Sequence, residues 1–244
     1  MISYKDKYLF IHIPRTGGTS IEEFLVHNSS PSSELVRDDA IERDLLRFQH
    51  IHAGRAKKIF LQRKDNYTEF FNFSFVRNPW ERLVSVYYYD HYTNLGLGRK
   101  SKKNTCFADY IKRSVPKNIN SKHDKDNLLF GTMSKTAPEK AYLRFTDNFW
   151  LFDDNDNMLM DFVGRFENLQ NDFDIVCDKL KIPRGSLKKL RACGNNDSCP
   201  WHKERGISIP KYEHYTTYYD DETLEIVNCL VQKDADYFGY KFGE

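Results

Sequence analysis

Two short apolar runs along the chain are each followed by a polar turn and then by a helical pattern. The first run covers residues 8–13 (YLFIHI), and the spacing of apolar residues predicts a helix over 19–27. The second run covers residues 70–76 (FFNFSFV), and a proline at a first-turn position predicts a helix over 79–90. A strand–loop–helix order that occurs twice predicts parallel strands and an α/β fold, with sites at the carboxyl ends of the strands.

Shorter predicted elements occupy the rest of the chain. Leu224, Val227 and Val231 form one apolar stripe, which predicts a closing helix over 220–237. No internal repeat or long linker interrupts the pattern, so we predict a single domain over residues 1–244. The other expected elements are helices at 40–48, 54–63 and 167–181, a strand, turn and strand at 148–152 and 159–166, a loop-rich insertion at 93–127 and an irregular segment at 193–217.

The composition excludes several classes of protein. Of the 244 residues, 40% are hydrophobic, which excludes a chain that is disordered throughout, and a net charge of +2 is not that of a general nucleic-acid binder. No apolar run reaches the roughly 18 residues of a membrane-spanning helix, and the first residues contain no signal sequence. We therefore expect no nucleic-acid partner, no integral membrane segment and a cytoplasmic location, or the Golgi lumen if the chain is a trimmed form of a longer protein.

Charge is unevenly distributed along the chain. Residues 99–125 hold nine Lys and Arg against two Asp, whereas residues 147–178 hold nine Asp and Glu against one Arg. Solvated surface accounts for both stretches. A docking surface for an anionic polymer or cofactor is a second interpretation of the basic stretch.

The cysteines do not predict a metal site. There are five of them, and no pair has the spacing typical of zinc ligands. Cys193 and Cys199 flank the sequence GNNDS, so they either close a small disulfide loop in an oxidising compartment or remain free thiols.

The segment between the first strand and its helix predicts a phosphate-binding loop. Two glycines allow the backbone N–H groups to point inward, the helix N-terminus adds partial positive charge, and Arg15 adds a full one. A P-loop kinase would instead contain GxxxxGK[ST], and here no Lys precedes the Thr-Ser pair. A turn that only caps the helix is the alternative. The residues expected to contact an anion are Pro14, Arg15, Thr16, Gly17, Gly18, Thr19 and Ser20.

A second anion site is expected after the second strand. Arg77 ends this strand, Ser85 lies inside the following helix, and Pro79 sets the start of that helix, so Arg77 and Ser85 are expected to converge on one anion. A P-loop NTPase normally ends this strand with an Asp that holds magnesium. We therefore predict phosphate binding without a metal. The alternative is a structural ion pair at Arg77.

Several segments of the chain resemble the family 2 carbohydrate sulfotransferases. The segments are IHIPRTGGTS (residues 11–20), FSFVRNPWERLVSVYYY (73–89), FVGRFENLQNDFDIVCDKLKIP (162–183) and the ending YYDDETLEIVNCLVQKDADYFGYKFG (218–243). Members of that family use 3′-phosphoadenosine 5′-phosphosulfate (PAPS), with adenosine 3′,5′-bisphosphate (PAP) as product. The resemblance implies a P-loop-like three-layer fold, with a mainly parallel central sheet flanked by helices. It also implies sulfonate transfer from PAPS to a hydroxyl of a carbohydrate or polysaccharide.

The resemblance also implies roles for individual residues. The loop from Arg15 to Ser20 would bind the 5′-phosphosulfate, and Arg77 with Ser85 would bind the 3′-phosphate. Lys203 and Tyr212 fall in the segment 201–215, where relatives close a loop over the nucleotide. The family usually has Lys where this chain has Arg15, and an Arg stabilises charge without giving up its proton. In Gly-Arg-Phe-Glu-Asn-Leu (164–169), we interpret Arg165 and Glu167 as residues of a helix start and an ion pair.

Sulfonate transfer requires a base for the acceptor hydroxyl. The segment FQHIHA (48–53) resembles the histidine segment of the family, and in an extended chain His50 and His52 point to one face. Either one is a candidate base, and an ordinary histidine has a pKa of about 6.5. His12, on the first strand, is interpreted as a core histidine beside the loop.

Two other functions remain open from the sequence. The departure at Arg15 is compatible with a catalytically silent relative that binds a nucleotide or a glycan. A P-loop nucleotide kinase is the less favoured alternative, since both GK[ST] and the metal-binding Asp are missing. The sequence leaves the acceptor, the position sulfated and the oligomeric state open.

Overall fold

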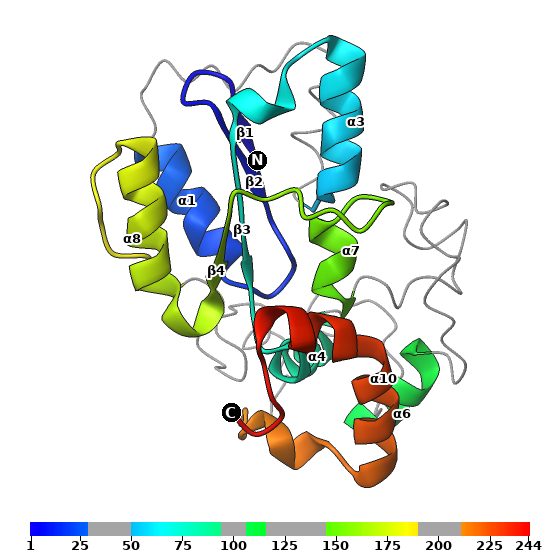
Figure 1. Ribbon diagram of the computed structural model, residues 1–244. Coiled ribbons are helices and arrows are strands. Elements are labelled where there is room, and N and C mark those ends of the chain that lie inside the picture. The colour runs from blue at the N-terminus through cyan, green and yellow to red at the C-terminus, as the bar shows by residue number, and fades with distance from the viewer. Residues whose placement is uncertain (29–49, 94–105, 116–144, 190–210) are drawn as a thin grey trace. The chain divides into compact units, whose positions relative to one another are not determined.

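The computed structural model describes residues 1–28, 50–93, 106–115, 145–189 and 211–244 (Figure 1). The chain divides into two compact units. The first comprises Met1–Arg77 and Lys122–Lys188, and the second comprises Asn78–Ser121 and Lys189–Glu244. The prediction of a single domain is not tested by this division and stays a prediction.

A four-stranded sheet forms the centre of the first unit. The strands are, in their order across the sheet, β1 (Ile2–Ser3), β2 (Tyr8–Ile11), β3 (Phe71–Val76) and β4 (Phe162–Arg165). β1 is antiparallel to β2, whereas β2, β3 and β4 are parallel, with Ile11 opposite Ser74 and Val76 opposite Arg165. Parallel strands end at one edge, so the residues that follow β2, β3 and β4 lie together there.

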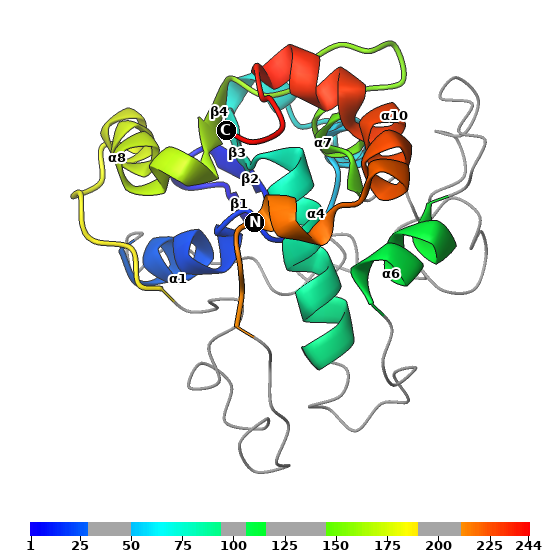
Figure 2. The ribbon, with the colours of Figure 1, turned by 90° about the horizontal axis from the view of Figure 1, so that it is seen from below.

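Helices flank both faces of this sheet. In two perpendicular views, α1 (Gly18–Asn28) and α8 (Leu169–Leu180) lie on one side, and α3 (Ala53–Arg63) and α7 (Asp147–Leu151) lie on the other (Figures 1 and 2). Two short 3-10 turns, Tyr67–Glu69 and Phe166–Asn168, precede β3 and α8. The first unit is therefore a mixed α/β structure with a mainly parallel sheet, as the sequence predicts.

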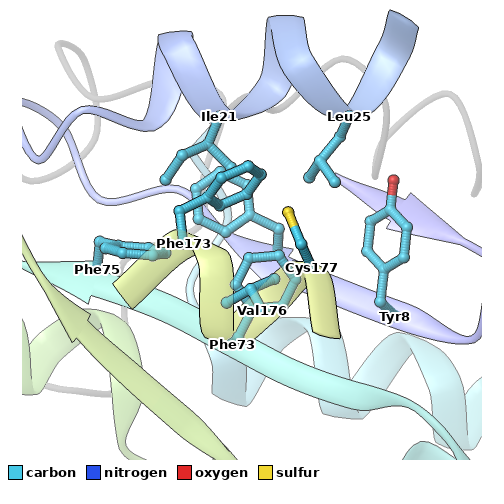
Figure 3. Close-up of a cluster of buried hydrophobic side chains, with 9 residues drawn as sticks. Tyr8, Ile21, Leu25, Phe73, Phe75, Phe173, Val176 and Cys177 are labelled. Carbon is cyan, nitrogen blue, oxygen red and sulfur yellow. The ribbon is translucent and has the colours of Figure 1, made fainter. Parts of the chain in front are cut away.

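The core between the sheet, α1 and α8 is aromatic and aliphatic (Figure 3). The rings of Phe10 and Phe73 stack with centroids 5.0 Å apart, and Phe24 meets Phe173 edge-on at 5.1 Å. Burial of one such side chain contributes about 1.5–3 kcal/mol. The core holds β2 and α1 on either side of the loop that joins them. Its buried members are Tyr8, Phe10, Ile21, Leu25, Phe73, Phe75, Phe173, Val176 and Cys177.

The described part of the second unit is helical. Its elements are α4 (Pro79–Tyr88), a π-helical turn at Tyr89–Thr93, α6 (Phe107–Ser114), a 3-10 turn at Tyr215–Tyr218 and α10 (Asp221–Phe238). Asn78 caps α4, whose first turn contains Pro79, and Asp220 with Thr223 forms a capping box that starts α10. Trp80 of α4 donates to Asn228 of α10 at 2.9 Å, which links the two helices.

Most predicted elements are confirmed, with ends that shift by a few residues. β2 and β3 lie inside the two apolar runs, β4 lies inside the second strand expected at 159–166, and α1, α3, α4, α8 and α10 lie where the pattern predicts helices. The helix expected at 40–48 lies outside the described residues. No helix in the described ranges is long and apolar enough to cross a membrane.

One prediction of local structure is wrong. The segment expected as a strand at 148–152 is α7, which buries Trp150 and Leu151, and only Phe152 pairs in β fashion, with Met158. A short apolar run does not distinguish a buried strand from a buried helical turn. The loop-rich insertion expected at 93–127 stays a prediction. Within it the structure describes α6, where Phe107 and Ile111 lie four residues apart and bury one helical face.

Candidate functional site

The loop between β2 and α1 adopts a strained backbone. Arg15 has a φ of 71° and Gly17 a φ of 84°, so both are left-handed. Between them, the fully buried Thr16 donates its hydroxyl proton to the carbonyl of Ile13 at 2.9 Å. A left-handed non-glycine residue costs on the order of 1–3 kcal/mol and persists only where its surroundings enforce it. The Thr16 hydroxyl therefore closes the loop, and its predicted anion contact rests on the main-chain N–H.

Neighbouring side chains approach both glycines of the loop closely. A Cβ atom at Gly17 would lie 2.7 Å from Leu169 Cδ2, and one at Gly18 would collide with the ring of His12. α1 has no acidic residue in its first turn, where Thr19 and Ser20 are partly exposed. The loop thus brings bare backbone and two hydroxyls to a helix N-terminus, the arrangement that suits an anion.

Arg77 connects the end of β3 to this loop. Its Nη1 donates to the carbonyl of Arg15 at 3.3 Å, and its Cζ lies 4.2 Å from the ring centroid of Phe166. Phe166 follows β4, so residues that follow all three parallel strands meet at one edge of the sheet (Figure 1). Arg77 is only 7% exposed, and its side chain fixes the loop as well as adding charge.

His50 lies against the end of β2. Its Nδ1 lies 2.8 Å from the carbonyl oxygen of His12, and the two imidazole rings meet edge-on with centroids 4.5 Å apart. A carbonyl only accepts, so Nδ1 of His50 carries the proton. In the neutral ring, Nε2 then has a lone pair that can accept a proton.

His52 has the opposite tautomer. It caps α3, and its Nδ1 accepts a hydrogen bond from the main-chain N–H of Arg55 at 3.2 Å. The lone pair of the neutral ring is therefore on Nδ1, and Nε2 carries the proton. Of the two histidines, His50 presents an acceptor at Nε2 and His52 presents a donor.

Burial lowers the pKa of both histidines. The pKa of His50 is lowered to about 4, chiefly by burial and next by the charge of His12. The pKa of His52 is also lowered to about 4, by burial and then by Arg55. Both rings are neutral at neutral pH, and the expectation of an ordinary histidine pKa is wrong.

The contacts predicted for several other residues singled out in the sequence are not tested by the structure. Ser85 is fully buried on α4, and the ring of Tyr212 lies 5.1 Å from that of Tyr88, both within the second unit. Their contacts with a nucleotide stay predictions, as does that of Pro14. Lys203 lies outside the described residues, and so do Cys193 and Cys199.

The structure adds residues to the site that the sequence does not identify. Phe166 and Leu169 pack on the loop, and Glu22 of α1 places Oε1 3.0 Å from Nδ1 of His12. Phe166 and Leu169 lie in a segment that carries the family resemblance, but the charged residues of 164–169 are Arg165 and Glu167, and both are exposed. Glu22 has no signal in the sequence, because nothing in its spacing relates it to His12.

Comparison with known proteins adds one match. The model of the sulfotransferase family, in its family 2 form, matches residues 1–241. Comparisons with curated proteins and with solved structures find no match. The family match includes β2 and its loop, the histidine segment, and α10 at the other end. The chain belongs to sulfotransferase family 2.

Proposed function

We propose that this sulfotransferase moves a sulfonate group from PAPS to a hydroxyl of a carbohydrate, with His50 as the general base. The observation that carries the proposal is the bond from Nδ1 of His50 to the carbonyl of His12, beside the loop of residues 14–20. It supports a neutral imidazole whose Nε2 is ready to accept a proton. The match of the family to nearly the whole chain supports the transfer of sulfonate in general.

The loop has the groups that a phosphosulfate requires. Glycine at 17 and 18 is compatible with the close packing around the backbone, and Arg15 supplies a permanent positive charge. A strand, a glycine loop and a helix N-terminus in this order also support the P-loop-like character of the fold. PAPS supplies the sulfonate group and a phosphate leaving group when it is bound. We infer that residues 14–20 hold its 5′ end, and that Arg77 and Ser85 hold the 3′-phosphate.

Each side chain of the site then has a task of its own. His50 takes the proton of the acceptor hydroxyl at Nε2, while its Nδ1–H bond keeps the ring oriented. His52 donates from Nε2 to an oxygen of the acceptor, since its Nδ1 is occupied by the cap of α3. Arg15 stabilises the negative charge of the departing phosphate and keeps its proton throughout.

We also propose that the two units act as one sulfotransferase domain. The single family match, which extends through residues of both units, supports this. A catalytically silent relative would bind PAP without transfer, so the test must measure binding and turnover separately.

The test uses two asparagine variants that keep the local hydrogen bonds. His50→Asn retains a donor toward the His12 carbonyl and loses Nε2, whereas His52→Asn retains the cap of α3. We expect His50→Asn to bind PAP like the wild type and to transfer sulfonate about 10²–10⁴-fold more slowly, the usual contribution of a general base. His52→Asn should slow sulfonate transfer by a smaller factor.

PAP affinity is measured by calorimetry, and transfer is measured with PAPS and a panel of unsulfated glycans. Wild-type turnover in His50→Asn would remove His50 as the base. PAP binding without turnover in the wild-type protein, across the panel, would favour the silent relative.

A further inference from the structure

His12 contacts both halves of the proposed site although no task has been assigned to it. His12 is buried, and its ring packs on Gly18 at the start of α1, where a Cβ atom would collide with it. The same ring meets His50 edge-on, and the carbonyl of His12 accepts from Nδ1 of His50. One residue thus touches the start of the loop helix and the candidate base.

The carboxylate of Glu22 lies beside Nδ1 of the His12 ring. Glu22 lies one turn into α1, with Oε1 3.0 Å from Nδ1 of His12, although the two groups are not aligned as a hydrogen bond. The side chain of Glu22 is 17% exposed and that of His12 is 4% exposed, so water screens this pair only weakly. A carboxylate at this depth acts on the charge of neighbouring rings.

We propose that Glu22 and His12 form a positioning pair: His12 orients His50 against the loop through its carbonyl and its ring, and the carboxylate of Glu22 stabilises the positive charge that His50 acquires when it takes the acceptor proton. The inference rests on the proposed role of His50 as base. No bond forms or breaks at His12 or Glu22, and no proton passes between them. The proton of the acceptor hydroxyl ends on Nε2 of His50.

The charges around His50 agree with this role. Besides burial, the charges of His12 and of the amino group of Met1 lower the pKa of His50, whereas its hydrogen bond to the His12 carbonyl and the charge of Glu22 raise it. Without Glu22, the imidazolium of His50 would keep only unfavourable charged neighbours among these groups. Glu22 therefore makes a buried, weak base a better proton acceptor.

Glu22→Gln tests the pair, and Glu23→Gln is the matched control. The first substitution keeps the size of the side chain and removes its charge. Glu23 is the next residue of α1 and pairs with Lys188 at the surface, at 3.1 Å. We expect Glu22→Gln to bind PAP normally, to lower the proton affinity of His50 about tenfold, which is one pKa unit, and to reduce kcat by up to a similar factor without changing the KM for PAPS.

The proton affinity of His50 is read by NMR titration of its ring in the intact protein without ligand, and kcat is read with PAPS and the glycan of the panel that the wild type sulfates. Glu22→Asp should restore part of the loss. A His50 titration in Glu22→Gln equal to that in Glu23→Gln overturns the pair, even if His50→Asn abolishes transfer. Full turnover in His50→Asn overturns the base itself, whatever the titration of Glu22→Gln shows.

Discussion

At the scale of single residues, substitutions at position 15 can distinguish the effect of charge from the effect of backbone conformation. Arg15 supplies the cation of the loop and also adopts a left-handed φ of 71°. Arg15→Ala and Arg15→Gly both remove the charge, but only glycine adopts this backbone without strain. We expect both variants to lose about 10²–10³-fold in kcat, as for one transition-state donor, and Arg15→Gly to be the more stable of the two.

Arg15→Lys is the control for the Ala and Gly variants. It keeps a positive charge, and we expect it to remain active. Turnover with PAPS and thermal unfolding are measured on all three variants. If Arg15→Ala turns over as fast as the wild type, Arg15 has no part in the chemistry.

The sequence predicts the residue types of the site better than their tautomers and hydrogen-bond partners. Glycines between a strand and a helix predict the loop, and the His-x-His spacing selects two candidate bases. The tautomers that distinguish His50 from His52 depend on the carbonyl of His12, far away in the sequence, and on the start of α3. Such partners become visible only when the chain is folded.

At the scale of elements, the candidate site lies at the shared edge of β2, β3 and β4. The apolar runs predict the first two strands, because a parallel strand covered on both faces is continuously apolar. The pattern wrongly predicts a strand at α7, since five residues are too few to show a period. Phe166 and Arg77 meet at this edge because β4 lies next to β3. The apolar pattern alone does not determine this order of the strands.

Substitutions of Arg77 test whether this edge of the sheet contributes to nucleotide binding. Arg77→Ala removes the bond to the loop and the contact with Phe166, so we expect PAP to bind more weakly by roughly 1.5–3 kcal/mol, as for a charged hydrogen bond. Arg77→Lys should recover only part, because Lys lacks the planar fork. Arg184→Ala, which breaks an exposed ion pair with Asp178, is the control and should leave PAP binding unchanged.

Calorimetric titration with PAP measures all three variants. An Arg77→Ala protein with wild-type affinity would show that the end of β3 does not contribute to the nucleotide site.

At the scale of the whole molecule, the buried histidines link folding to pH. His50 and His52 have pKa values of about 4 in the folded chain, against about 6.5 when unfolded. The unfolded chain therefore binds more protons between these values, and the free energy of unfolding falls as the pH drops from about 6.5 to about 4. Each histidine contributes up to about 3 kcal/mol to this loss.

Urea unfolding at several pH values measures the slope. We expect the double variant His50→Asn, His52→Asn to have a flatter profile in this window, whereas the exposed His27→Gln should follow the wild type. Equal slopes in all three proteins would contradict the lowered pKa values.

The α/β class and the family of the whole molecule can be predicted from the sequence, because the order of the motifs along the chain indicates both. The division into two units cannot, because segments 78–121 and 189–244 join across a long stretch of sequence without any linker signal.

The bond between Arg77 and residue 15 goes to a main-chain carbonyl and not to a side chain. Every amino acid has that carbonyl, so this hydrogen bond does not require a particular side chain at position 15. A Lys at position 15, the residue that the family resemblance implies is usual, would accept the same bond from Arg77 as the Arg of this chain. With the proposed role of Arg15, an exchange between these two cations would change the chemistry at the leaving group while the hydrogen bond to the loop is kept.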